Sequence, residues 1–167
     1  WKIEIHNCRI LDNTASERGG GVYVVSPEFT LADSLVQGNV AEGSRTQSGG
    51  SSSIFEGIGG GIHLRVATQI LMTNSIVRDN RSGAGGSGLE VATSAGAAVT
   101  IKDCTIAANA GDFSGAQCGA VRLDNEIFAL FERTTLSENR MDRLPVATSL
   151  NGAILGDPLT IGELTDC

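Results

Sequence analysis

A nine-residue pattern recurs five times along this chain, and it constrains the fold more than any other feature of the sequence. Each copy begins with an apolar residue, carries a small residue at its fourth position and an aliphatic residue at its sixth, and ends with asparagine. The copies are IHNCRILDN, LADSLVQGN, MTNSIVRDN, IKDCTIAAN and FERTTLSEN, which end at Asn13, Asn39, Asn80, Asn109 and Asn139. Repeats that align without a gap indicate an architecture in which each copy is one structural unit stacked on its neighbours.

A short glycine-containing element follows each copy and leads into the next one. It reads GGV from Gly20, GGI from Gly60, SGL from Ser87, GAV from Gly119 and GAI from Gly152. The distance from this element to the next copy varies little, whereas the distance from the asparagine to the element varies widely. Stacked coils behave in this way, because insertions collect as loops at one corner. The same spacing after Ile154 leads to LTDC at the end of the chain, which matches IHNC and IKDC and predicts a sixth repeat.

The apolar residues that follow each glycine element alternate with other residues, as in the pairs Val22 and Val24, and Ile62 and Leu64. A period of two is typical of a strand with one buried face, and the 22 glycines argue against helices. Strands in successive repeats run in the same direction, and parallel connections are overwhelmingly right-handed. We therefore expect an all-β, right-handed parallel β-helix of about six coils, with one long loop insertion at 40–59 in the second coil. It would form a single domain over 1–167 and belong to a longer chain.

Asparagine and aspartate at two positions of the repeat have structural explanations. The third position holds Asn7, Asp33, Asn74 and Asp103, and these residue types tolerate the left-handed backbone of a tight corner. The ninth position is always asparagine, which we expect to mark the next corner. Strands stack about 4.8 Å apart, so the amides of Asn13, Asn39, Asn80, Asn109 and Asn139 can bond to one another as a structural ladder.

Charge and cysteine content narrow the possible partners. The net charge is −7 and the pI about 4.7, which argues against nucleic acid as a ligand. No apolar run is long enough to cross a bilayer. Cys8, Cys104 and Cys167 occupy the same small position in coils too far apart for a disulfide, so we expect buried thiols there. Cys118 lies beside a variable loop, where it is either free or paired.

One stripe of residues is a candidate surface for binding. The residue after the first apolar position of each strand is Tyr23, His63, Glu90 and Arg122 in successive coils. This stripe is interpreted either as a polar groove that grips a glycan or a partner protein, or as a solvated ladder of salt bridges. Glycoside cleavage needs acids close together, but the repeated acids fall in alternate coils: Asp33, Asp103 and Asp166, and Asp12, Asp79 and Glu138. We therefore expect no catalytic residue, no metal site and no cofactor.

Two further features concern loops and modification. The segment 40–59 is rich in glycine and serine and is interrupted by Ile54, Phe55 and Ile58. Such a composition predicts flexibility, and we expect the three apolar residues to pack back onto the flank of the protein. Asn80 begins an Asn-Arg-Ser glycosylation sequon, but its place in the ladder argues against glycosylation there.

The two motifs together resemble the repeats of chlamydial polymorphic outer-membrane proteins and of related bacterial and algal surface β-helices. The residues that carry the resemblance are Gly20-Gly21-Val22, Gly119-Ala120-Val121 and Gly152-Ala153-Ile154, with the strings ILDN, VQGN, VRDN, IAAN and LSEN. The resemblance implies an extracellular or surface-attached protein with an adhesive or structural role. The sequence also resembles the broader pectin-lyase-like superfold, which includes enzymes, and a fold alone does not decide between these functions.

The leading hypothesis is a non-enzymatic extracellular or cell-surface β-helix that serves as a structural scaffold, an adhesin or a filament segment. Its partners would be neighbouring coils or domains of its own longer chain, and in addition a glycan or a surface protein. The alternative is a carbohydrate-active β-helix, similar to polysaccharide lyases and hydrolases, whose catalytic coils lie outside residues 1–167.

Overall fold

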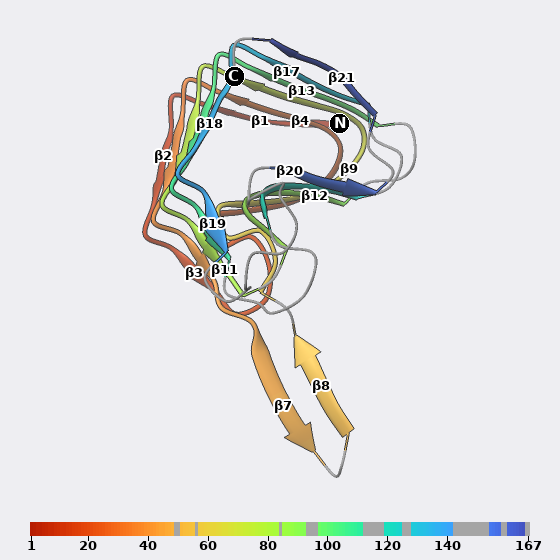
Figure 1. The fold of residues 1–167 in the computed structure, drawn as a ribbon. Helices are drawn as coiled ribbons and strands as arrows, with labels where there is room; N and C mark the ends of the chain where they lie inside the picture. The colour runs from red at the N-terminus through yellow and green to blue at the C-terminus, as the bar shows by residue number, and fades with distance from the viewer. Residues whose placement is uncertain are drawn as a thin grey trace.

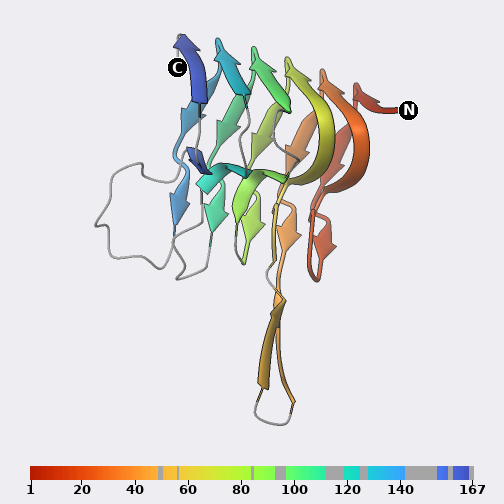
Figure 2. The same cartoon turned by 90° about the vertical axis from the view of Figure 1, so that its right-hand side faces the viewer.

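The computed structural model describes residues 1–48, 51–55, 57–83, 85–92, 97–111, 119–124, 128–141, 154–157 and 160–165. Within these ranges the chain is all-β, without a helix. Three sheets are built from parallel pairs only, and one small two-stranded sheet is antiparallel. Figure 1 is viewed along the direction in which the strands of each sheet follow one another, and Figure 2, turned by 90°, shows these strands side by side. The prediction of an all-β chain with parallel sheets is confirmed.

The largest sheet has nine strands and forms two walls joined by a curve (Figure 1). The long strands β4 and β9 run through this curve, whereas the later strands occupy one wall each. Its members are β1 (Lys2–His6), β4 (Val22–Ala32), β9 (Ile62–Thr73), β12 (Gly86–Ala92), β13 (Ala98–Lys102), β16 (Gly119–Asp124), β17 (Phe128–Glu132), β20 (Ile154–Asp157) and β21 (Thr160–Thr165).

Two sheets of five short strands complete the stack. The second sheet contains β2 (Arg9–Leu11), β5 (Leu35–Gln37), β10 (Ile76–Arg78), β14 (Thr105–Ala107) and β18 (Thr135–Ser137). The third contains β3 (Thr14–Ala15), β6 (Val40–Ala41), β11 (Arg81–Ser82), β15 (Ala110–Gly111) and β19 (Arg140–Met141). The chain passes through the second and third sheets and returns to the first, so that each passage lies against the one before. We call one such passage a layer.

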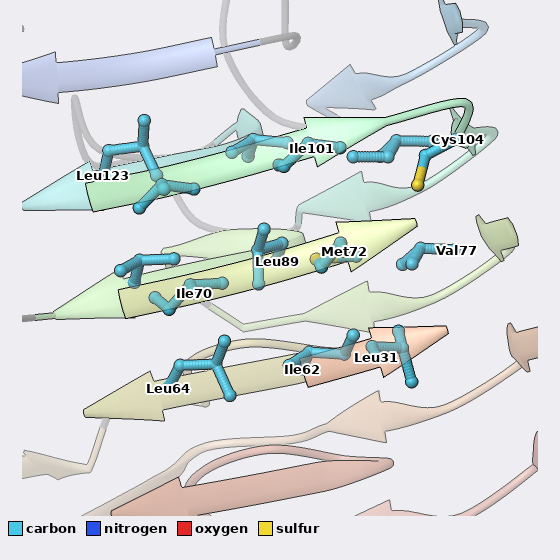
Figure 3. Packing of buried hydrophobic residues seen from close by; sticks show 14 of the residues in the cluster. Leu31, Ile62, Leu64, Ile70, Met72, Val77, Leu89, Ile101, Cys104 and Leu123 are labelled. Atoms are coloured by element: carbon cyan, nitrogen blue, oxygen red, sulfur yellow. The ribbon is translucent and has the colours of Figure 1, made fainter. Parts of the chain in front are cut away.

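The register between layers follows the nine-residue repeat. The first apolar residue of each copy pairs with its counterparts, Leu31 with Met72, Met72 with Ile101, and Ile101 with Phe131. All four side chains are fully buried. Figure 3 shows Leu31, Met72 and Ile101 among the other core side chains that the strands direct inward. Burying an aliphatic or aromatic side chain contributes about 1.5–3 kcal/mol, so this interior is the main source of stability.

The third position of the repeat adopts the left-handed backbone expected of a corner. The values of φ are 52° at Asn7, 52° at Asp33, 45° at Asn74, 53° at Asp103 and 45° at Arg133. A second left-handed corner lies at the eighth position, which the sequence analysis did not predict. It is formed by Asp12, Gly38, Asp79, Ala108 and Glu138, so the residue before the invariant asparagine makes the turn.

The long insertion contains an antiparallel hairpin of β7 (Ser44–Ser48) and β8 (Ser51–Phe55). The hairpin projects away from the stacked layers (Figures 1 and 2). Ile54 and Phe55 belong to β8, and the expectation for their packing concerns side chains outside those that the structure describes. Ile58 stays at the base, half-buried, and its backbone bridges to Arg18. Pairing of the two halves satisfies the backbone groups that β7 and β8 direct toward each other, without help from the body.

Removing the hairpin should leave the stack intact. Its two ends meet at the body, where a Cβ on Gly57 would lie 2.5 Å from the amide nitrogen of Gly43. We expect replacement of residues 44–56 by two glycines to change the free energy of unfolding by less than about 1 kcal/mol, because closing a shorter loop costs little. Urea unfolding of the shortened and full chains measures the difference. A loss of several kcal/mol would show that the hairpin supports the layers.

Candidate functional site

The invariant asparagines lie in one row that runs through the layers. The side-chain Nδ2 of each asparagine donates a hydrogen bond to the Oδ1 of the next, over 2.9 Å from Asn13 to Asn39 and 3.0 Å at each of the three later steps. The backbone N–H of each asparagine donates to the same oxygen, over 3.0–3.1 Å. Asn39, Asn80 and Asn109 are fully buried. The five residues selected by the repeat are thus brought together as a continuous hydrogen-bonded column.

The second hydrogen of each side-chain amide bonds to the backbone of the preceding layer. Nδ2 of Asn39 donates to the carbonyl of Ile10 over 3.0 Å, and Nδ2 of Asn80 donates to that of Val36 over 3.1 Å. Asn109 and Asn139 repeat the contact with Val77 and Ile106. Both hydrogens of each interior amide therefore have acceptors and its oxygen has two donors. Because every hydrogen-bonding group of the interior amides has a partner, a polar side chain can occupy the interior of these layers.

A second column is formed by the small residues at the fourth position. The hydroxyls of Ser34 and Ser75 and the thiols of Cys8 and Cys104 each donate to the carbonyl two residues earlier, over 2.7–3.1 Å. Thiol and hydroxyl thus fill the same position in different layers. Cys8 and Cys104 are free, and burial raises the pKa of the Cys104 thiol. The predictions for Cys118 and Cys167 concern positions outside the described residues.

The residues of the candidate stripe pair with one another on neighbouring strands, but they differ widely in solvent exposure. Tyr23 pairs with His63, His63 with Glu90, and Glu90 with Arg122. Tyr23 is 46% exposed, whereas His63 is 2% and Glu90 1% exposed. The Arg122 side chain is 13% exposed. The expectation of a solvent-facing stripe therefore holds only at Tyr23.

Glycine-containing corner segments lie against the residues of the stripe. Gly19, Gly59 and Gly85 have φ of 59°, 68° and 71°. A Cβ on Gly19 would lie 2.8 Å from that of Tyr23, and a Cβ on Gly59 would lie 2.7 Å from that of His63. The segments thus fold back over the outward side chains of the strands that follow them. From the sequence these glycines are expected only to make tight returns, and the burial that they cause is not apparent from it.

Glu90 and Arg122 form an ion pair beside these segments. Nη1 of Arg122 lies 3.0 Å from Oε1 of Glu90, and the backbone N–H of Gly86 donates to Oε2 of Glu90 over 2.6 Å. A buried carboxylate is tolerated only when it is paired and hydrogen-bonded, as here. The interpretation of the stripe as a salt-bridge ladder thus applies to this pair, although Glu90 is buried and Arg122 is only slightly exposed.

His63 is the polar residue of the site that lacks such compensation. Neither ring nitrogen has a hydrogen-bond partner among the residues that the structure describes. Burial lowers the pKa of His63 to about 4, and the nearby positive charges of Arg18, Arg65 and Arg122 act in the same direction. The ring lies against Tyr23, with 5.3 Å between ring centroids. His63 is therefore a neutral side chain at neutral pH.

This histidine should make stability depend on pH. The unfolded chain binds a proton at His63 below about pH 6.5, whereas the folded chain binds it only below about pH 4. The free energy of unfolding should therefore lose about 3 kcal/mol as the pH falls from 6.5 to 4, with the full contribution present above 6.5. Urea unfolding of the wild type and of His63→Phe at several values between pH 4 and 7 measures this loss. The two proteins should differ in the slope of the free energy of unfolding against pH. His6→Phe, at the exposed histidine, should keep the wild-type slope, and an unchanged slope in His63→Phe would contradict the prediction.

Two of the repeated acidic residues, Asp33 and Asp103, are engaged in contacts between layers. Oδ1 of Asp33 accepts a hydrogen bond from Asn74 over 2.6 Å, and Asp103 accepts two from the Arg133 guanidinium. The hydrogen bond from Arg133 holds the pKa of Asp103 below its usual range. Asp166 lies outside the described residues. No group of three or more potential metal ligands occurs within the ranges that the structure describes. The sequon residue Asn80 is fully buried, in agreement with the argument against its glycosylation.

Comparisons with known proteins find no relative of this chain. No model of a protein family matches it, and no curated protein and no solved structure is similar to it. In the described part of the chain, no helix has the length and apolar character needed to cross a membrane.

Proposed function

We propose that residues 1–167 form about six coils of a right-handed parallel β-helix within a longer chain, and that this domain is a non-enzymatic structural element of the cell surface or extracellular space. It would act as a scaffold, an adhesin or a filament segment. The observation that carries the proposal is the asparagine column, in which every interior amide is bonded to the layers on both sides. A column of this kind joins layers along one axis, as an elongated scaffold requires.

The contacts of the layers support a mechanical role. Backbone pairing, the core and two side-chain columns all connect one layer with the next. In such an assembly each layer contacts only its neighbours, so stability is approximately a sum over layers and interfaces. Length can then be adjusted by adding layers without redesigning the core. The partners of the domain would be further coils or domains of its own longer chain.

A glycan or a surface protein would bind at the exposed end of the stripe. Tyr23 lines a shallow depression of about 330 Å³ together with Ala15, Ser16, Glu17 and Arg18. An exposed aromatic ring beside charged and hydroxyl side chains combines an apolar platform with hydrogen-bonding groups, which suits such ligands. Glycan-array binding of the wild type and of Tyr23→Ala tests this surface. Val25→Ala, at an exposed residue outside the depression, is the control, and equal binding by all three proteins would contradict the assignment.

Removal of one complete layer tests the architecture. Met72 and Ile101 occupy equivalent positions, so deletion of Met72–Thr100 joins Leu71 to Ile101 in register. We expect the shortened chain to fold with a β circular-dichroism spectrum and a cooperative but less stable transition. Deletion of Met72–Ile101 is the control, because a shift of one residue exchanges inward and outward side chains. Failure of both variants to fold would contradict the proposed repeat architecture.

The non-enzymatic role requires its own test. Incubation of the protein with a set of polyuronides, followed by detection of cleaved ends, distinguishes a scaffold from a polysaccharide lyase or hydrolase. We expect no cleavage above that of a heat-unfolded control. Turnover that the native protein supports would replace the scaffold proposal with the carbohydrate-active alternative.

A further inference from the structure

His63 is buried in a site that offers its ring no hydrogen-bond acceptor. Its side chain is 2% exposed, and both ring nitrogens lack a partner among the described residues. The Tyr23 ring lies on one side, with 5.3 Å between the ring centroids, and Glu90 pairs with His63 on the next strand. Gly59 lies against a third side, because a Cβ there would be 2.7 Å from that of His63. A protonated imidazole has two N–H groups to satisfy, so this site suits only the neutral ring.

The charged groups around His63 also oppose a positive charge on its ring. Three guanidinium groups act on the ring, and they belong to Arg18, Arg65 and Arg122. On the adjoining strand, the Glu90 carboxylate has both oxygens engaged, by the Arg122 guanidinium and by a backbone N–H. Glu17, on the corner before β4, is exposed. A proton on the enclosed ring is therefore unfavourable, whereas in acid it becomes favourable once water reaches the ring.

The corner segment 57–61, which lies against the histidine, is held chiefly by its backbone. Four of its five residues are glycine, so Ile58 supplies the one side chain, which is half-buried. The N–H groups of Ile58, Gly60 and Gly61 donate to carbonyls of the neighbouring corners over 2.8–3.2 Å. Gly59 has a φ of 68°, and glycine reaches other backbone conformations at little steric cost. A segment with so few buried side-chain contacts opens at a lower free energy than the packed strands.

We propose that the segment 57–61 is an acid-operated latch, which stays closed against the neutral His63 ring and opens when the ring takes up a proton. Opening admits water, which supplies the acceptors that the closed site lacks. The latch lies between the end of β8 and the start of β9, so its opening also loosens the base of the hairpin on one side. Acid thus frees the hairpin relative to the stack before the layers themselves unfold.

Amide hydrogen exchange, measured by NMR at several values between pH 4.5 and 7, tests the latch. The reporters are the N–H groups of Ile58, Gly60 and Gly61, and those of Thr105 and Ala110 in the second and third sheets are the reference. With each rate corrected for the intrinsic effect of pH, we expect the latch amides to be less protected than the reference amides. Protection of the latch amides should fall at least about tenfold from pH 7 to pH 4.5, because the open latch lets His63 bind a proton with its ordinary affinity.

His63→Phe is the matched control, because it removes the proton site and keeps an aromatic ring against Tyr23. Its latch amides should keep the same protection across this pH range, as should those of His63→Leu, a second variant that takes up no proton. His6→Phe, at the exposed histidine, should show the same fall as the wild type. Latch protection that is independent of pH in the wild type would overturn the proposal, because the ring would then reach water by another route, such as rotation of Tyr23. Equal protection of latch and reference amides at every pH would overturn it as well, since only global unfolding would then expose His63.

Discussion

Replacing Asn80 by alanine should lower the free energy of unfolding by at least about 4 kcal/mol. Asn80 is fully buried, and its Nδ2 donates to the Val36 carbonyl and to Asn109. Its Oδ1 accepts from the N–H and the Nδ2 of Asn39. Alanine removes all four bonds, although the Asn109 oxygen keeps the bond from the backbone N–H of residue 80 and Nδ2 of Asn39 keeps its bond to the Ile10 carbonyl. Each buried hydrogen bond lost costs about 1 kcal/mol or more. Urea unfolding measures the loss.

The matched control is Asn13→Ala at the exposed end of the same column. Asn13 contributes its side chain to a single hydrogen bond with Asn39 in the described structure, and water can reach the site. Its removal should cost about 1 kcal/mol, the usual net value of one hydrogen bond. Similar losses for the two variants would show that the column is not the interior support of the stack.

Gly60→Ala should be nearly as damaging, for a steric reason. A Cβ at this position would lie 2.4 Å from the carbonyl oxygen of Arg81 and 2.5 Å from that of Ser87. Both atoms belong to backbone, so relief requires that neighbouring layers move apart. Inserting a group into a packed interior typically costs about 1–3 kcal/mol, and we expect the upper part of that range. Thermal and urea unfolding of the purified variant measure the cost.

Gly88→Ala provides the comparison for this prediction. There the closest backbone atom, the carbonyl oxygen of Ala120, lies 2.9 Å away, and the other near atoms belong to the Asn109 side chain. The variant should lose less stability than Gly60→Ala, since this contact is less severe. A larger loss at Gly88 than at Gly60 would contradict the assignment of the effect to the backbone clash.

Several local features were readable from the sequence because they depend on spacing. The constant distances within the nine-residue repeat determine that Leu31, Met72 and Ile101 share one interior position, and the pairing of the strands agrees. The left-handed corners at Asn7, Asp33, Asn74 and Asp103 follow from the backbone preferences of asparagine and aspartate. Parallel strands follow from repeats that run in one direction.

Other features depended on which segments fold over which, and a repeat pattern does not contain that information. Alternation shows that His63 and Glu90 point away from the core, but only the return of the corner segments at Gly59 and Gly85 buries them. The composition of 40–59 suggested a flexible loop, and the pairing of Ser44–Ser48 with Ser51–Phe55 was not apparent from its polar residues.

The sequence by itself determined the period of the chain, the residues that face inward and the asparagines available for a column, because each follows from local spacing and backbone preference. The tertiary structure alone decided the burial of the stripe, the loss of hydrogen bonding at His63 and the outward path of the hairpin. These properties arise when variable corner segments settle against neighbouring layers. Solvent exposure at such a position depends on contacts between residues far apart in sequence.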